Sequence, residues 1–111
     1  MPAAALAFSP LGVTVSFTAA STVPTSVQAK SATGKQNSYQ YRIVNTGHEI
    51  VLLGVGVDDT AAKAAAASIA AGAIPMVPGA VEVLGFPAGS YFTGKTASGT
   101  SVVYVTPGEG L

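Results

Sequence analysis

The sequence carries very few charged residues. Only five Lys or Arg and five Asp or Glu occur among 111 residues, and the formal net charge is zero. A soluble domain usually has about 25% charged residues, whereas the proportion here is 9%. Sparse and balanced charge removes the electrostatic repulsion that keeps copies of a protein apart in solution. We therefore expect a subunit whose surface is covered by neighbouring molecules.

Cysteine and tryptophan are absent, and His48 is the single histidine. Without cysteine the chain has no disulfide, thiolate nucleophile or Cys-based metal site. No carboxylate accompanies His48 at a spacing that would place two metal ligands on one face of a strand or helix. Lys and Arg form no cluster that could neutralise nucleic-acid phosphates. The composition therefore argues against a metal site and against binding of DNA or RNA.

The remaining polar residues form no catalytic pattern. Asp58 and Asp59 are followed by Thr60 and a run of alanines, which supply none of the further oxygen ligands of a calcium loop. One histidine and no G-x-S-x-G element leave no frame for a catalytic triad, and the carboxylates lack the Trp platform of a sugar site. Gly54 and Gly56 are not followed by the third glycine of a dinucleotide-binding loop. We expect no enzymatic activity and no cofactor.

Long hydrophobic runs are also missing. Residues 61–73 are mostly Ala, are interrupted by Lys63 and are too few to cross a membrane, so we expect no membrane partner. Residues 1–11 are small and apolar, but they lack the basic region of a secretory leader. We interpret them as an arm in front of a single domain over residues 12–111. The large apolar side chains of this arm, which we expect to dock on a neighbouring molecule, are Leu6, Phe8 and Leu11.

Short β-prone runs, separated by Gly, Pro, Ser, Thr and Asn, fill most of the chain. Alternation is clearest over 13–18, where Val13, Val15 and Phe17 share one face and hydroxyl residues occupy the other. The turn signals recur at the interval typical of sandwiches, and no parallel β-α-β rhythm appears. The predicted fold class is all-β, an antiparallel β-sandwich of jelly-roll or immunoglobulin-like kind. Further strands are expected over 26–29, 39–44, 49–57, 81–86, 90–93 and 101–106.

Two of these strands are expected to form a hairpin, because Asn45-Thr46-Gly47 between 39–44 and 49–57 favours a tight turn. The second strand is almost continuously apolar, as in a strand covered on both sides at a sheet centre or against a partner subunit. Gly54 and Gly56 share one face and permit the close approach of another backbone or ring. The face proposed for self-contact is centred on Val51, Leu53 and Val55.

One helical insertion is predicted among the strands. Asp58 or Asp59 can cap its beginning, alanine favours the helical conformation, and Gly72 stands where a helix commonly ends. A helix this short is marginal unless it is packed, so an irregular Ala-rich segment over 61–73 is the alternative.

A short, cysteine-free, weakly charged β-sandwich chain with an apolar Pro-bearing N-terminal segment resembles the capsid decoration, or cement, proteins of tailed bacteriophages. The resemblance lies in overall organisation and in segments 41–47 and 105–111. It implies a structural virion protein, made in the host cytoplasm, that forms a dimer or trimer and binds the major capsid protein on the outside of the head. A phage tail or fibre domain, a bacterial surface subunit and a small carbohydrate-binding or surface-binding module are the alternatives.

Overall fold

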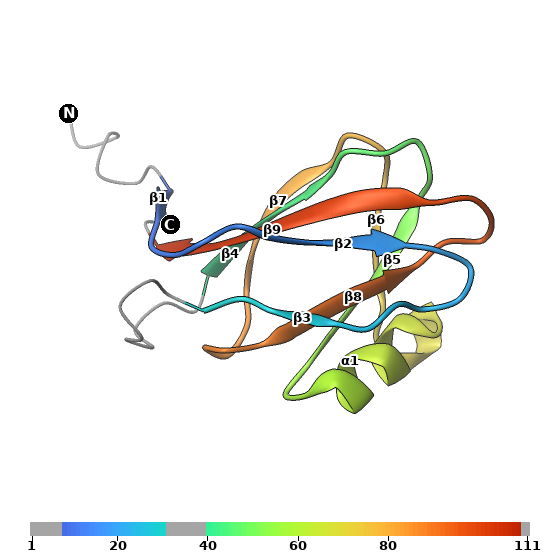
Figure 1. The fold of residues 1–111 in the computed structure, drawn as a ribbon, viewed down its shortest axis with the longest axis horizontal. Helices are drawn as coiled ribbons and strands as arrows, with labels where there is room; N and C mark the ends of the chain where they lie inside the picture. Colours follow the sequence, from blue (N-terminus) through green and yellow to red (C-terminus); the bar gives the residue numbers. More distant parts are fainter. Residues whose placement is uncertain (1–7, 31–39, 110–111) are drawn as a thin grey trace.

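Two antiparallel sheets form the body of the protein (Figure 1). The structure is a computed structural model that describes residues 8–30 and 40–109. The predicted all-β sandwich with one short helix is confirmed. The first sheet has the order β2 (Val15–Ala19), β9 (Ser101–Glu109), β4 (Gln40–Asn45) and β7 (Val81–Gly85), and β1 (Ser9–Pro10) pairs with the end of β9. The second sheet has the order β3 (Val27–Gln28), β8 (Tyr91–Lys95), β5 (Val51–Gly56) and β6 (Ile74–Met76).

The strand pairing is that of a jelly roll. β2 pairs with β9, β3 with β8, β4 with β7 and β5 with β6, so the second half of the chain pairs with the first half in reverse order. This nested ribbon folds over on itself, which also brings β9 beside β4 and β8 beside β5. Eight strands arranged in this way form two Greek keys. Of the two kinds of sandwich expected from the sequence, the structure therefore shows the jelly roll.

The prediction of a hairpin between residues 39–44 and 49–57 is wrong. β4 and β5 lie in different sheets and do not pair with each other. Neither Asn45 nor Gly47 has a positive φ, as the predicted tight turn would require. Gly47 instead lies against Ser101, where a Cβ would overlap the serine hydroxyl. The segment between the strands therefore crosses from one sheet to the other.

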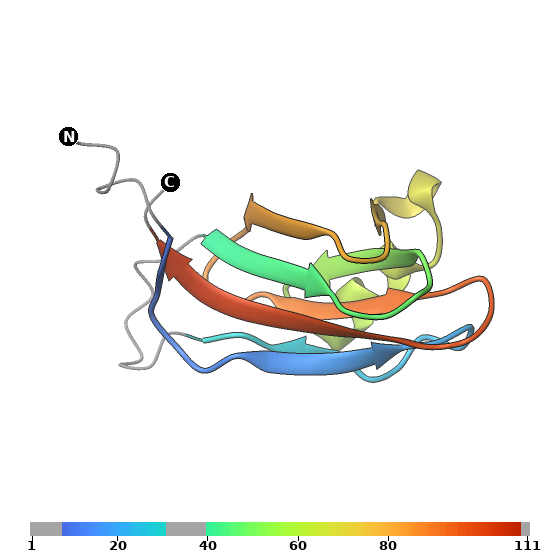
Figure 2. The ribbon, with the colours of Figure 1, turned by 90° about the horizontal axis from the view of Figure 1, so that it is seen from above.

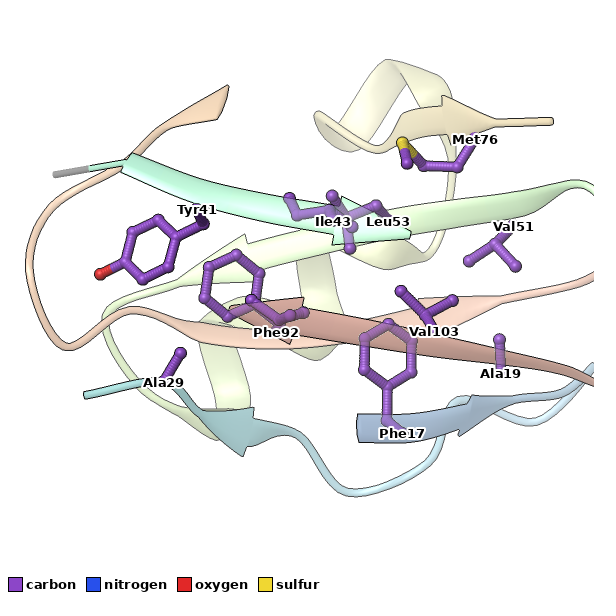
Figure 3. Packing of buried hydrophobic residues seen from close by; sticks show 11 residues of the cluster. Phe17, Ala19, Ala29, Tyr41, Ile43, Val51, Leu53, Met76, Phe92 and Val103 are labelled. Carbon is purple, nitrogen blue, oxygen red and sulfur yellow. The ribbon is translucent and has the colours of Figure 1, made fainter. Parts of the chain in front are cut away.

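Period-two alternation places one side chain in two in the space between the sheets (Figure 3). The ring centroids of Tyr41 and Phe92 lie 4.9 Å apart, and those of Phe86 and Phe92 lie 5.8 Å apart. The Tyr41 hydroxyl donates a hydrogen bond to the Pro87 carbonyl at 2.9 Å. The only polar group of the Tyr41 side chain, the largest in the core, therefore has a hydrogen-bond partner at the edge of the core. Its other fully buried large apolar residues are Ile43, Val51, Leu53, Met76, Val103 and Val105.

Two strand features differ from the expectation. β6 contains Pro75, and it forms the outer strand of its sheet, where a missing N–H group is tolerated. Val13 was expected to face the interior with Phe17, but it precedes β2 and is 73% exposed. Val13 therefore lies outside the sheet, and the strand that carries Phe17 begins only at Val15.

The Ala-rich segment is helical. α1 (Asp59–Ala66) begins at Asp58, whose side chain accepts a hydrogen bond from Ala61 N at 2.8 Å, so the predicted cap is confirmed. A short 3-10 helix, η2 (Ile69–Ala71), follows after Ser68 and ends at Gly72, whose φ is +112°. The single predicted helix is therefore two helices with a break between them. No helix in the described part of the chain has the length and hydropathy of a membrane span.

Helix α1 packs directly on the backbone of β5, on the side of the second sheet that faces away from the first sheet (Figure 1). A Cβ built on Gly54 would lie 2.5 Å from Ala66 N, and one built on Gly56 would lie 2.5 Å from Ala62 N. The close approach predicted for these two glycines is therefore confirmed, and its partner is the chain's own helix. Because glycine and alanine present so little side chain, helix and strand come into backbone contact.

Candidate interaction surface

The outer face of the first sheet is built from the side chains that alternate with the buried ones. Tyr104 on β9 lies in register between Ser16 on β2 and Val44 on β4, and Val44 is paired in turn with Val81 on β7. This row crosses the whole sheet. Tyr104 is 42% exposed and Val81 is 51% exposed, although both are large apolar residues. We call this surface the Tyr104 face; its residues are Ser16, Thr18, Gln40, Arg42, Val44, Val81, Val83, Val102, Tyr104 and Thr106.

Arg42 is the one charged residue among those of the Tyr104 face. Apart from Gln40, the other polar residues of the face bear hydroxyl groups. The Thr106 hydroxyl lies 2.7 Å from the hydroxyl of Thr14, just before β2, close enough for a hydrogen bond. Hydroxyl groups lose far less hydration than charged groups when they are covered. Valine and tyrosine gain from being covered, at about 25 cal/mol for each Å² of apolar surface removed from water. The chemistry of this face therefore favours contact with another surface.

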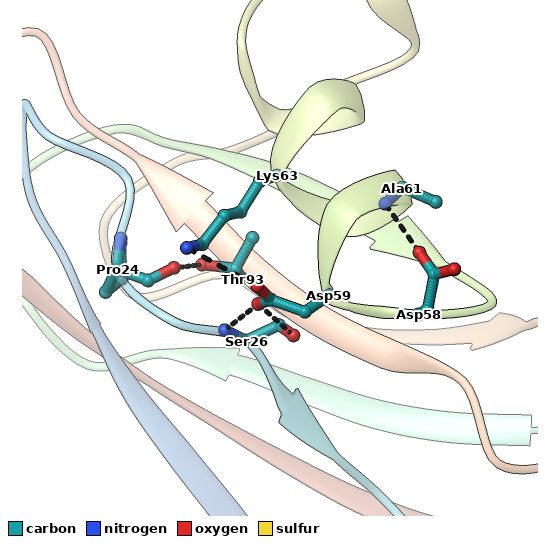
Figure 4. Close-up of polar contacts among 7 residues, drawn as sticks. All are labelled: Pro24, Ser26, Asp58, Asp59, Ala61, Lys63 and Thr93. Carbon is teal, nitrogen blue, oxygen red and sulfur yellow. Dashed lines mark hydrogen bonds and ion pairs between the residues drawn. The ribbon is translucent and has the colours of Figure 1, made fainter.

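Helix α1 covers only the second sheet, and it is fixed there by polar contacts at its first turn (Figure 4). The Asp59 carboxylate accepts hydrogen bonds from the backbone N–H and the hydroxyl of Ser26, both at 2.7 Å. Lys63 lies 3.4 Å from the same carboxylate. The Ser26 hydrogen bonds, with a smaller contribution from Lys63, hold the pKa of Asp59 below its usual value. These contacts join the helix to the segment before β3 and have a structural role.

Two of the hollows that open on the surface of the described residues are mainly apolar. One, of about 170 Å³, is lined by Val55, Ile74 and Phe86 among others. The second, of about 390 Å³, lies along Ile50 and Leu52 and contains one ionisable group, the Lys95 ammonium. Neither brings together an acid, a base and a nucleophile.

The candidate metal and acid-base residues lie apart. Over residues 8–30 and 40–109, no three His, Asp or Glu side chains come together in a way that could hold a metal ion. His48 is exposed, and Asp58 caps the helix. Within the same ranges every buried side-chain nitrogen or oxygen atom has a hydrogen-bond partner.

The self-contact predicted through Val51 and Leu53 is wrong. Both side chains are fully buried in the core of a single chain, because the first sheet covers this face of β5. Val55 is half-buried against the same core and lines the smaller hollow. The nearly continuous apolar sequence of this strand reflects coverage by its own sandwich on one side and by α1 on the other.

The expected free arm is also corrected over the part that the structure describes. β1 pairs with β9, and Leu11 donates a backbone hydrogen bond to the Pro107 carbonyl at 2.9 Å. The ring of Phe8 lies over Gly108, where an added Cβ would collide with it. Phe8 and Leu11 therefore contact their own domain. Leu6 lies outside the described residues.

Sequence reasoning missed the Tyr104 face because it did not assign Tyr104 to either face of its strand. Tyr41 is indeed buried, whereas Tyr104 has the opposite parity from Val103 and Val105, its buried neighbours. The alternation over 101–106 contained this information. Comparisons with known protein families, with curated proteins and with solved structures find no significant match to this chain.

Proposed function

We propose that this protein is a non-enzymatic structural subunit of a virion, a capsid decoration protein that binds the outer surface of a phage head through the Tyr104 face. The row of Tyr104, Val44 and Val81, in which Tyr104 and Val81 are exposed, on a sheet face with a single charge is the observation that carries the proposal. The jelly roll supports it as an analogy of fold, because viral capsid domains, among others, use this architecture.

Such a subunit stabilises a shell by adding contacts across the boundaries between capsid subunits. Each contact can be modest, because engagement of one site raises the effective concentration at the next. A flat face of Val, Thr, Ser and Tyr suits this task, since interfaces of this kind are depleted in charge at their centre and enriched in aromatic residues. The sparse charge of the whole chain is consistent with surfaces that are covered in the assembled particle.

The experiment compares heads assembled with and without this subunit under a heat challenge and a low-salt challenge, with release of DNA as the readout. We expect heads without the subunit to open at lower temperature, and added wild-type protein to restore them. The Y104D variant should fail to restore them, because a carboxylate at the centre of the face must lose its hydration on binding. The I69D variant is the matched control, since Ile69 is 57% exposed on η2, outside the face.

If heads without the subunit survive both challenges as well as complete heads, the decoration role is wrong, and a tail or fibre location takes its place. If Y104D and I69D restore the heads equally, the subunit binds through a surface other than the Tyr104 face.

A further inference from the structure

The sandwich presents four outer strands, and three of them carry features that hinder pairing with another chain. Unpaired strand edges are templates for association, and natural proteins protect them with proline, short strands or charges that point toward the sandwich interior. β6 has Pro75 at its centre, and β3 is only two residues long. β7 carries Glu82, which is paired with the inward-facing Ile43 and is itself exposed. A strand added beside β7 would cover that carboxylate.

β2 has none of these features. Its five residues, Val15–Ala19, include no charge, proline or glycine, and they keep one continuous register with β9. Among the described residues, no strand pairs with β2 on the side away from β9 (Figure 2). The short β1, which contains Pro10, lies further along the same side of β9 and leaves the length of β2 open. The unprotected edge of this fold is therefore β2.

We infer that two copies of this chain pair with each other, antiparallel, along β2. A two-fold axis at Phe17 places Ser16 of one copy opposite Thr18 of the second copy, and Val15 opposite Ala19. The hydroxyl pair then lies on the outer face and the apolar pair on the inner face, so each side chain meets one of its own kind. Cross-strand pairs of hydroxyl residues are favourable, and no like charges oppose each other anywhere along this pairing. The contact is isologous and closes as a dimer.

The partner is a second copy because β2 is complementary to itself. Its main-chain donors and acceptors are matched by the same strand run in the opposite direction, and its side chains need no partner of opposite charge. Pairing joins the two first sheets into one and places two Tyr104 faces side by side. The dimer itself is independent of the proposed function; only the use of the doubled face on a capsid rests on it.

Sedimentation equilibrium of the purified full chain tests the pairing. We expect the wild-type protein to have twice the mass of 10.9 kDa at micromolar concentration. The S16K/T18K variant places lysine opposite lysine at both ends of the pairing and should weaken the dimer about tenfold or more. The S16K/T18E variant places lysine opposite glutamate and should remain dimeric. The V81K/V83K variant adds the same charge at the β7 edge and should also remain dimeric.

Disulfide trapping tests the register, because the chain has no cysteine of its own. Directly opposed residues in an antiparallel pair have Cα atoms about 4.5 to 5.5 Å apart, within disulfide range. Position 16 is two residues away from position 16 of the second copy, or about 8 Å, which is too far. A mixture of S16C and T18C proteins should therefore form the mixed disulfide dimer, whereas each variant alone should remain largely uncrosslinked under the same oxidation.

A monomeric wild-type protein overturns the proposal, and so does a dimer that S16K/T18K leaves intact. A dimer in which S16C crosslinks with itself as readily as with T18C contradicts the register at Phe17. None of these results depends on capsids, so a failure here is distinguishable from a failure of the decoration role.

Discussion

Replacing Asn45 by alanine should destabilise the protein more than any surface change, because the Asn45 side chain joins three connections between strands. Its Nδ2 group donates to the carbonyls of Glu49, Met76 and Val77 at 2.9, 2.9 and 3.2 Å. Its Oδ1 atom accepts from the Ser101 hydroxyl at 2.6 Å and from Gly47 N at 3.2 Å. The residue is fully buried, so no water replaces these partners in the variant without a rearrangement.

The magnitude follows from the groups that lose their partner. The Val77 carbonyl keeps a hydrogen bond from Ala80 N, whereas the bonds to the Met76 carbonyl and from the Ser101 hydroxyl are buried. Two buried polar groups left unsatisfied, at about 1–3 kcal/mol each, predict a loss of about 4 kcal/mol in the free energy of unfolding. For a domain of this size the midpoint of thermal unfolding should fall by about 15 °C or more.

Urea denaturation of Asn45→Ala, Ser101→Ala and wild type, at one protein concentration and one oligomeric state, measures this loss. Ser101→Ala should cost only about 1 kcal/mol, because Oδ1 keeps the hydrogen bond from Gly47 N. Asn45→Asp adds a test in which the direction of the pH dependence of stability is predicted. A carboxylate facing three carbonyls is unfavourable and its pKa should be raised, so this variant should be less destabilised near pH 4 than near pH 7. A loss below about 1 kcal/mol for Asn45→Ala would refute the reasoning.

Three further substitutions test the helix and its surroundings. Gly54→Ala should lift α1 from β5, because the new Cβ would lie 2.5 Å from Ala66 N; we expect a loss of about 1–3 kcal/mol and faster amide exchange in α1, and unchanged exchange would contradict the packing. Gly79→Ala is the contrast, since its Cβ meets nothing within 4 Å and only the φ of +79° opposes it, at about 1–2 kcal/mol in denaturation. Asp59→Asn tests the lowered pKa: the wild-type carboxylate stabilises the fold above the pKa of an unfolded Asp, and this stability is lost as pH falls through the lower folded value. The free energy of unfolding of the variant should therefore fall less steeply with decreasing pH than that of wild type. An equally steep fall would exclude the Asp59–Ser26 contact as the cause of the acid dependence.

Local signals in the sequence predict which segments are strands and which face of each is buried. Phe17 is buried, as the alternation over 13–18 predicts, and the strands expected over 39–44 and 101–106 appear in the structure as β4 and β9. Asp58 and Gly72 bound the helical segment where the capping chemistry indicated. These features depend on residues close to each other in the chain, and the chain therefore encodes them locally.

The partner of each strand could not be predicted in this way. β4 and β5 are consecutive and have a turn-like sequence between them. Nevertheless β4 pairs with β7 and β9, whereas β5 pairs with β6 and β8. Their pairing is decided by which faces must be buried together and by the Asn45 side chain, whose partners lie up to 56 residues away. The candidate surface was missed for a different reason: the alternation over 101–106 places Tyr104 on the opposite face from Val103 and Val105, but it was not used to assign Tyr104 to a face.

The nested pairing of the jelly roll has a consequence for how the chain reaches this structure. Of the ribbon pairs in the described residues, β5 and β6 are the closest in sequence, and each further pair encloses a longer loop, up to the pairing of Val15 with Val105. Closing long loops costs entropy before any contact compensates it, so folding should be slow and should proceed from the β5–β6 end outward. β9 pairs with β1, β2 and β4, and until it is in place one edge of β4 and one edge of β2 have no partner. A nascent chain therefore exposes both edges of β2, its most association-prone strand, for most of its synthesis, and β2 gains its strand partner β9 only in the last step of folding.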